Sequence, residues 1–161
     1  MTLQLDAQST ALFERHRQTF FPPALNQIPA HLTLFHKLPG EDLDAIVRTA
    51  ARVCPRRPFP VAISHLMPLG RGVAYAVTSP ALNALRASLA DAFAPTLTGQ
   101  DRQRFRPHIT VQNKVAPPEA RRTLDLLART FAPFEATAEG LQLWHYLGGP
   151  WSPAGALPFT P

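Results

Sequence analysis

The sequence is poor in cysteine and in long apolar runs. Cys54 is the only cysteine among 161 residues, so an internal disulfide is excluded and a reducing cytoplasm is the simplest compartment. A helix needs about 20 mostly apolar residues to cross a bilayer, and no segment approaches that length. The first residues contain neither the basic stretch nor the cleavage site of a signal peptide. We therefore expect a cytoplasmic protein with no membrane partner.

Several motifs of metal and cofactor chemistry are also missing. There is no His-x-His, no His-Glu-x-x-His and no cysteine pair, which are the spacings that bring several ligands to one metal ion. There is also no Gly-x-Ser-x-Gly turn, phosphate-binding loop or dinucleotide fingerprint. We therefore expect no bound metal and no cofactor.

The composition is that of a folded protein with a basic surface. Hydrophobic residues make up 45% of the chain and charged residues 17%, which is ordinary for a globular domain. The net charge is +5, mainly from arginine, and the sequence pI is near 10.3. Such a charge favours polyanionic partners, but it is equally typical of a soluble surface that uses arginine in place of lysine.

Hydrophobic periodicity predicts an alternation of strands and helices, and most of the 18 prolines fall between these elements. Ser79 is the expected N-cap of the third helix, with Pro80 at its first position. The expected strands are 1–5, 31–36, 59–67, 72–78, 108–114, 134–147 and 156–159, and the expected helices are 7–20, 41–53, 80–93 and 118–130.

The order strand, helix, strand, helix, strand occurs twice, and the two central strands are offset by 108 − 31 = 77 residues. We therefore predict an α+β fold in a single domain, 1–161, built from pseudo-repeats of approximately 1–68 and 69–161. Such a duplication predicts two lobes related by a pseudo-twofold axis. The two central strands are expected to face one another across a cleft, where a binding site is most often found.

Each central strand carries the pattern His, apolar, Thr, apolar, at 31–34 and at 108–111. Side chains alternate between the faces of a strand, so His31 and Thr33 share one face, and His108 and Thr110 share the corresponding face in the second half. A single His-x-Thr is expected by chance roughly once in every two such chains, but two copies at matching repeat positions are not. We therefore assign the two motifs to one active site.

Two histidines and two threonines suit the cleavage of a phosphodiester. One imidazole can accept a proton from the attacking hydroxyl or water while the other protonates the leaving oxygen, because the pKa of histidine lies near neutrality. The hydroxyls of Thr33 and Thr110 can donate hydrogen bonds to the non-bridging oxygens. His31 and His108 are thus the predicted catalytic residues, and the threonines the predicted phosphate-binding residues.

Further candidates lie near the motifs in the sequence, and each also has a purely structural interpretation. Trp144 and Tyr146 share a strand face and can stack on a base or pack in the core. The remaining histidines lack a paired context and are interpreted as structural or surface residues. The other substrate-binding candidates continue the motif strands or precede the second one: Phe35, Gln112 and Lys114, then Arg104 and Arg106 on either side of Phe105.

At these motifs the sequence resembles the 2H phosphoesterase superfamily, specifically bacterial 2'-5' RNA ligase family proteins. The similarity covers nearly the whole chain, through the segments FFPPALNQIPAHLTLFHKLPG, LGRGVAYAV, DRQRFRPHITVQNKV and LWHYLGGPW. The resemblance implies a bilobal α+β fold, with antiparallel sheets around a central cleft, and activity on 2',3'-cyclic phosphates or 2'-5' linkages without metal or ATP. It also favours His31 as the general acid and His108 as the general base.

The resulting functional hypothesis is a metal-independent phosphodiesterase. It would convert 2',3'-cyclic phosphate ends of RNA or nucleotides to 2'-phosphates, with reversible 2'-5' RNA ligation as a related activity, and it would act as a monomer. The alternatives are a phosphodiesterase for small nucleotides, such as a cyclic phosphate of ADP-ribose or an oligonucleotide, and a non-catalytic module that binds nucleotides or RNA.

Overall fold

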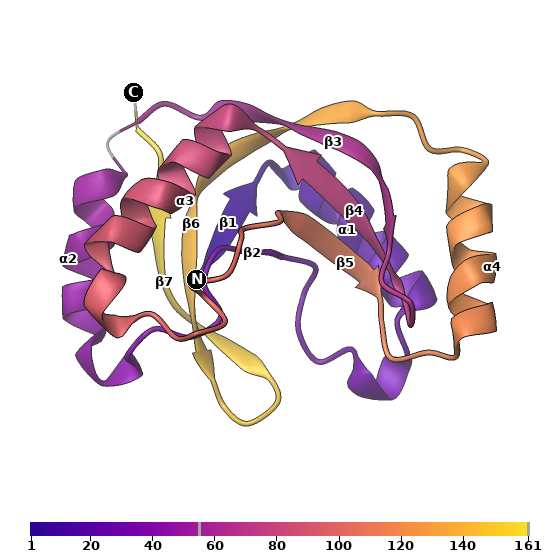
Figure 1. Ribbon diagram of the computed structural model, residues 1–161, viewed down its shortest axis with the longest axis horizontal. Coiled ribbons are helices and arrows are strands. Elements are labelled where there is room, and N and C mark those ends of the chain that lie inside the picture. Colours follow the sequence, from indigo (N-terminus) through magenta and orange to yellow (C-terminus); the bar gives the residue numbers. More distant parts are fainter. Residues whose placement is uncertain (55, 161) are drawn as a thin grey trace.

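The computed structural model describes residues 1–54 and 56–160, so the end of the predicted domain at residue 161 lies outside the described residues. In these two ranges no helix is long and apolar enough to cross a membrane. Figure 1 shows the helices and strands, which are β1 Thr2–Leu5, α1 Ala7–Phe20, β2 Leu32–Thr33, α2 Leu43–Val53, β3 Phe59–Pro68, β4 Val73–Thr78, α3 Pro80–Ala92, β5 His108–Gln112, α4 Pro117–Ala128, β6 Phe134–Tyr146 and β7 Trp151–Pro158.

Local sequence signals set the helix ends. The side chain of Asp6 accepts a hydrogen bond from the backbone N of Ser9 at 2.8 Å and begins α1, which ends just before Pro22. The predicted cap at Ser79 is confirmed, because its Oγ accepts from the backbone N of Leu82 at 3.3 Å and Pro80 occupies the first position of α3. These caps satisfy backbone donors that have no partner within the helix.

The pairing of the strands is symmetric between the two halves of the chain. All pairs are antiparallel, and they link the strands in the order β1-β2-β5-β4-β3-β6-β7, with β1 also paired to β6. If β1 is exchanged with β4, β2 with β5 and β3 with β6, every pair among these six strands becomes another observed pair or itself. For example, β1–β2 becomes β4–β5, and β1–β6 becomes β4–β3. This symmetry supports the proposed duplication, with the β2–β5 pair at its centre.

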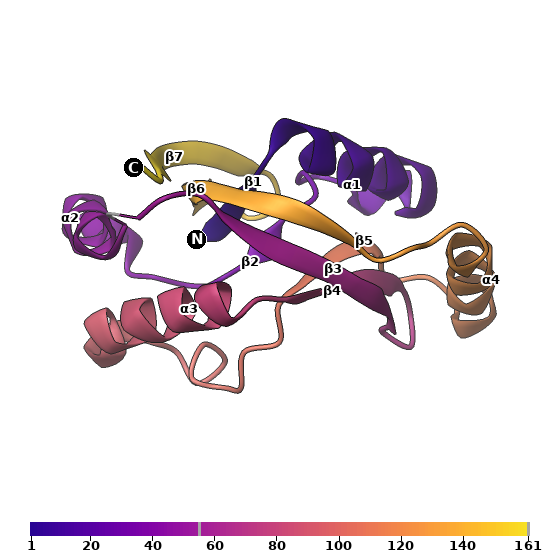
Figure 2. The same ribbon diagram turned by 90° about the horizontal axis from the view of Figure 1, so that it is seen from above.

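The helices lie around these strands in a matching way. Figure 2 shows α1 and α3 on opposite faces of the strands, and α2 and α4 at opposite ends of the molecule. Helix α1 packs on β5, α4 on β3 and β4, and α2 against α3 and β7. Apolar residues from both halves, including Phe13, Leu32, Ile63, Leu85 and Ile109, form one buried core.

Two expected strands differ in length by more than two residues from those in the structure. The strand expected at 31–36 is paired only over Leu32–Thr33, because the backbone N of Leu34 and of Phe35 both bond to the carbonyl oxygen of Met1, at 3.0 and 3.2 Å. The strand expected at 156–159 begins earlier, at Trp151, as the second arm of a hairpin with β6.

Gly72 offers a test of the packing beside the second motif. It lies just before β4 and is packed against β5, where a Cβ atom would overlap the backbone of Gln112 and Asn113. Gly72→Ala is expected to lower the melting temperature by several degrees, because such overpacking costs about 1–3 kcal/mol and 1 kcal/mol shifts the Tm of a chain this size by about 2–4 °C. Gly99→Ala is the control, since a Cβ there meets nothing within 4 Å. Equal melting temperatures for both variants would contradict this account.

Candidate active site

The two motif strands are hydrogen-bonded neighbours. Leu32 of β2 and Ile109 of β5, the middle residues of the two His-x-Thr motifs, are register partners. Both side chains point into the core, with exposed fractions of 0% and 1%. The sequence led us to expect strands facing across a gap, whereas the structure joins them edge to edge, which places the flanking residues of both motifs on one shared face.

The register fixes how the four motif side chains are arranged. In an antiparallel pair centred on the middle residues, His31 lies opposite Thr110, and Thr33 lies opposite His108. Directly opposite Cβ atoms are about 4.5–5.5 Å apart and diagonal neighbours about 7–8 Å. The histidines therefore occupy one diagonal of a four-residue square and the threonines the other, and each imidazole has a hydroxyl beside it.

Each imidazole is held by a backbone carbonyl two residues before it. Nδ1 of His31 lies 2.7 Å from the oxygen of Pro29, and Nδ1 of His108 lies 2.8 Å from the oxygen of Arg106. A carbonyl oxygen only accepts, so Nδ1 carries the hydrogen in both rings. Nε2 is therefore the atom of each histidine that is left to exchange a proton.

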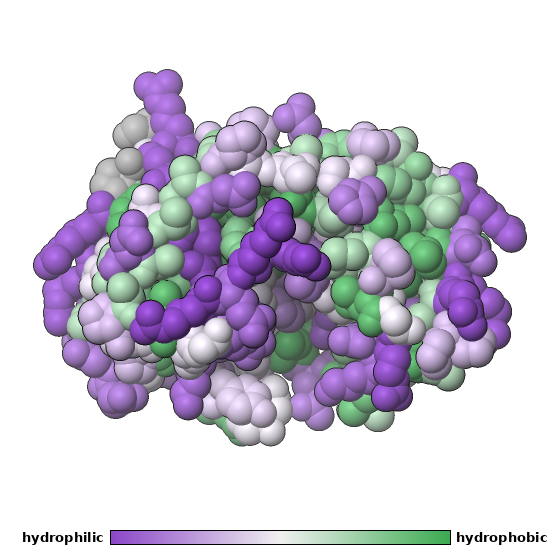
Figure 3. All heavy atoms as spheres, in the orientation of Figure 1, coloured by the Kyte–Doolittle hydropathy of each residue, from purple (hydrophilic) through white to green (hydrophobic). Residues whose placement is uncertain are grey.

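The four motif residues line one cavity of about 730 Å³. Figure 3 shows the surface hollowed near the middle of this face, with both hydrophilic and hydrophobic residues around the hollow. The cavity is large enough for a nucleotide-sized ligand. Its other lining residues come from the N-terminal Met1, the segment after β2, α2 and the β6–β7 hairpin, and they include Phe35, His36, Lys37, Leu43, Ile46, Trp144, His145, Tyr146 and Trp151.

Aromatic residues of the β6–β7 hairpin stand beside the first motif. The ring of Trp151 lies 4.7 Å from that of His31, and the ring of Trp144 lies 5.9 Å from that of Trp151. Nε1 of Trp144 donates to Oγ1 of Thr2 at 2.9 Å, which fixes its ring, while Tyr146 is 72% exposed at the cavity edge. Sequence reasoning missed Trp151, although its pairing with Tyr146 could have been inferred from the Gly-Gly-Pro turn between them.

Two buried arginines hold the motif segments in a reciprocal way. Arg17, on α1 of the first half, donates from Nη1 to the carbonyl of Thr110 in the second half at 2.9 Å. Arg86, on α3 of the second half, donates from Nε to the carbonyl of Leu34 in the first half at 2.8 Å. Each guanidinium also lies over a phenylalanine ring, 4.0 Å above Phe21 and 3.8 Å above Phe35 respectively. The motif backbone is thus fixed from both sides.

The surroundings of His31 oppose its protonation. Burial is the largest cause and, together with the positive charges of Arg17, the N-terminal amino group and His108, it lowers the pKa of His31 to about 4, although the bond to the Pro29 carbonyl acts in the opposite direction. His31 is therefore neutral in the free protein at neutral pH. The guanidinium of Arg17 makes this corner of the cavity attractive to an anion.

The structure brings only some of the substrate-binding candidates to the cavity. Trp144 and Tyr146 line it, and Phe35 forms part of its wall while being 1% exposed. Lys114 is exposed and lies in a turn with φ of 63°, where the chain leaves β5, and it is not among the lining residues.

Gln112 and the two arginines before the second motif also lie outside the cavity lining. Gln112 is buried, and its Nε2 donates to Oγ1 of Thr123 on α4 at 2.9 Å, because the register of β5 against β4 shifts between Thr110 and Gln112 and the alternation of buried and open residues ends there. Arg104 and Arg106 have exposed side chains. Arg106 contributes to the site only through its backbone carbonyl, which accepts the hydrogen bond from Nδ1 of His108.

The described residues contain no group of three or more His, Cys, Asp or Glu side chains that could hold a metal ion. The imidazoles of the two catalytic candidates are instead each bonded to a backbone carbonyl, as described above. The chemistry that this arrangement offers directly is proton transfer and hydrogen-bond donation.

Comparison with known proteins places the chain in a family. A family model for the 2'-5' RNA ligase superfamily matches residues 5–150. The chain belongs to this superfamily. Its family resemblance, drawn above from the motifs, is thereby confirmed, while a search of the curated proteins finds no significant match.

Several solved structures share the fold at low identity. TT0787 of Thermus thermophilus has a TM-score of 0.67 and 18% identity, covering 98% of this chain and 95% of that one. LigT of E. coli complexed with 3'-AMP has a TM-score of 0.63 and 19% identity, covering 99% and 96%. A further phosphoesterase has a TM-score of 0.64 and 19% identity, covering 99% and 96%. The predicted α+β fold with antiparallel strands is thus confirmed.

The lowered pKa of His31 leads to a direct prediction. In an NMR titration of the free protein, the Cε1–H resonance of His31, assigned by its loss in His31→Ala, is expected to titrate near pH 4. In the unfolded chain the same imidazole has a pKa near 6.5. Between pH 6.5 and pH 4 the unfolded state therefore binds more protons than the folded state. The contribution of His31 to the free energy of unfolding is lost as the pH falls through this range. A midpoint near 6.5 in the folded protein would contradict the burial argument.

Proposed function

We propose that this member of the superfamily is a metal-independent phosphodiesterase that opens 2',3'-cyclic phosphates of nucleotides or RNA ends to 2'-phosphates. The observation that carries the proposal is the square of His31, Thr33, His108 and Thr110 in one cavity, with each Nε2 left free by a bond at Nδ1. A strained cyclic phosphate can be opened by acid and base catalysis alone, so this pair of imidazoles is sufficient chemistry.

The proposed reaction uses the two histidines on opposite sides of the phosphorus. Nε2 of His108 accepts a proton from a water molecule, whose oxygen attacks the phosphorus. The bond from phosphorus to O3' breaks, and Nε2 of His31 gives its proton to O3', which leaves a 3'-hydroxyl and a 2'-phosphate. The hydroxyls of Thr33 and Thr110 donate to the two non-bridging oxygens, where negative charge increases in the transition state.

The acid role requires a protonated His31, although this residue is neutral in the free protein. Its pKa is lowered by burial and also by neighbouring positive charges, and a bound phosphate anion offsets those charges. Substrate binding is therefore expected to return a proton to His31, so that the acid forms only when its substrate is present. A 5'-hydroxyl that attacked the phosphorus in place of water, giving its proton to His108 while the P–O3' bond breaks and His31 protonates O3', would be joined through a 2'-5' linkage, which would constitute ligation.

A nucleotide fits the remaining walls of the cavity. Trp144, Tyr146 and Trp151 offer aromatic surface for a base next to the first motif. Crystal structures of E. coli LigT hold 3'-AMP, NADP+ and ATP, and this supports a nucleotide pocket on the same fold. A small-nucleotide substrate and a short RNA end both satisfy these contacts, and the assay below separates them.

The deciding experiment is a turnover assay, run with and without EDTA, on a panel of 2',3'-cyclic mononucleotides, ADP-ribose cyclic phosphate and short RNAs with cyclic phosphate ends. Phosphorus NMR of the products is expected to show 2'-phosphates. His31→Ala and His108→Ala should each lose at least about 10²-fold in rate, the lower part of the range for a lost acid or base. His65→Ala, a change to an exposed histidine outside the cavity lining, is the control. No turnover with any substrate would favour a binding module, and loss of turnover in EDTA would overturn the metal-free mechanism.

The same two variants also test the roles of the histidines. A substrate whose leaving oxygen departs without protonation no longer needs an acid. With it, His31→Ala is expected to regain much of its activity while His108→Ala stays slow. The opposite rescue would reverse the two roles.

The threonines provide a further prediction. Losing one hydrogen-bond donor to the transition-state oxyanion lowers kcat by about 10²–10³-fold. We expect Thr33→Ala and Thr110→Ala each to lower kcat by about 10²-fold or less, because a water molecule can supply part of the lost hydrogen bonding. Thr→Ser at either position keeps the donor and should retain most of kcat. Normal kcat in both alanine variants would exclude the phosphate-binding role.

A further inference from the structure

A second polar cluster lies on the cavity wall formed by the segment after β2. His36 and Lys37 line the same cavity as the motif square, and they follow His31 by five and six residues in the chain. The side chain of His36 is 54% exposed, whereas that of its partner Asp101 is 1% exposed. A histidine open to the cavity is therefore anchored to a buried carboxylate that the sequence analysis did not single out.

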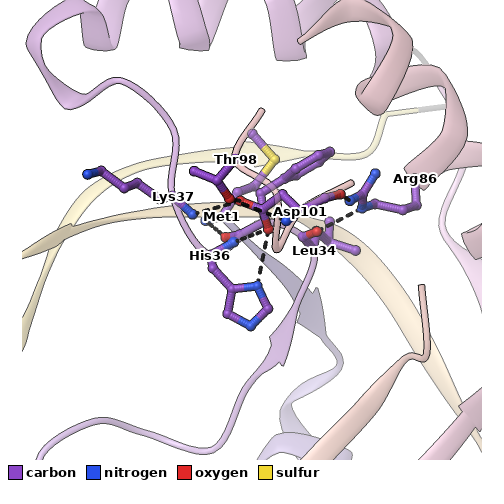
Figure 4. Close-up of polar contacts among 8 residues, drawn as sticks. Met1, Leu34, His36, Lys37, Arg86, Thr98 and Asp101 are labelled. Atoms are coloured by element: carbon purple, nitrogen blue, oxygen red, sulfur yellow. Dashed lines mark hydrogen bonds and ion pairs between the residues drawn. The ribbon is translucent and has the colours of Figure 1, made fainter. Parts of the chain in front are cut away.

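Asp101 holds this segment through several hydrogen bonds, which Figure 4 shows. Its Oδ1 accepts from the backbone N of His36 at 2.8 Å and lies 3.1 Å from Nδ1 of the same residue. Its Oδ2 accepts from the backbone N of Lys37 and from Oγ1 of Thr98, both at 3.1 Å. Burial opposes ionisation, but these bonds prevail and hold the pKa of Asp101 below its usual value. The carboxylate is thus charged and acts only as an acceptor.

The bond from Asp101 determines what His36 can offer to a ligand. Because the carboxylate only accepts, Nδ1 of His36 carries a hydrogen. The opposite edge of the ring, with Nε2, is directed away from Asp101 in Figure 4. Asp101 already accepts from two backbone N–H groups and a hydroxyl, so the imidazole is not required to satisfy it. Nε2 is thus the ring atom of His36 that remains for a ligand in the cavity.

The charges around His36 favour an anion at Nε2. The guanidinium of Arg86 donates to the backbone oxygen of Asp101 and interacts with the charge of its carboxylate, which is therefore offset by a neighbouring cation. An N–H at Nε2 would donate to a second anion in the cavity while the N–H at Nδ1 donates to the carboxylate. Phosphate is the anion that the adjacent site is proposed to handle.

We propose that His36, oriented by Asp101, forms a second phosphate subsite in this cavity. This inference rests on the proposed function and narrows its substrate to one that carries a second phosphate besides the reacting one. Five residues of extended chain span at most about 18 Å, so the subsite lies within reach of the same short ligand. The second phosphate is either a 5'-phosphate of the reacting nucleotide or the next phosphodiester of an oligonucleotide.

Binding of product-type ligands tests the subsite without depending on turnover. Calorimetry at one pH and ionic strength would compare adenosine 2'-phosphate, adenosine 2',5'-bisphosphate and a diadenosine ending in a 2'-phosphate. The wild type is expected to bind at least one ligand with two phosphates about tenfold or more tightly than adenosine 2'-phosphate, as is usual for one charge-assisted hydrogen bond. Which of the two ligands gains affinity identifies the source of the phosphate.

The variant His36→Gln should remove most of that preference, while His65→Gln, the matched control at an exposed histidine outside the cavity lining, should keep it. The ratio of the two Kd values is the readout, because a general loss of structure weakens both ligands together. Equal affinities in the wild type, or an unchanged ratio in His36→Gln, would overturn the subsite. Failure of the proposed function appears separately, as absence of turnover in the assay above.

Discussion

The pairing of Leu32 with Ile109 is the contact on which the rest of the site depends. It joins the two halves of the chain at equivalent positions of their motifs. Since the residues on either side of a paired position face the same way, this one register places both histidines and both threonines on a single surface. A slip by one residue in either strand would turn that strand's histidine and threonine toward the core.

The buried arginines make the register stable where the strands themselves are short. Strand β2 contains only Leu32–Thr33, too little to fix an orientation through its own ladder. Arg17 and Arg86, which are 3% and 7% exposed, each reach from a helix of one half to a motif carbonyl of the other. Burying a guanidinium is tolerated because its hydrogen bonds are satisfied. The positive charge of Arg17 also disfavours a proton on His31, so the residue that positions the site also tunes it.

Much of the fold could be predicted from periodicity and capping. The helix expected at 7–20 is α1 with the same bounds, and the cap at Ser79 is present. The strand after His31 was predicted too long, because the backbone of Leu34 and Phe35 bonds to Met1, and that of His36 and Lys37 bonds to Asp101, in place of a neighbouring strand. Such long-range partners leave no local signal. The candidates Gln112 and Lys114 illustrate the same limit: strand alternation gives a face but not where along the strand the cavity ends.

The sequence by itself determined the residue types and the spacing of the two motifs. It also determined which neighbours of the motif residues are buried and in what order strands and helices follow one another. These features are visible in one chain because side chains repeat every two residues in a strand and every 3.6 residues in a helix. Only the tertiary structure decided that the motif strands are neighbours, that Trp151 stands beside His31 and that Asp101 anchors His36. These contacts join residues far apart in the chain, or on strands whose pairing was not predicted. Their geometry depends on register and on buried charge, which become defined only when the whole core is packed.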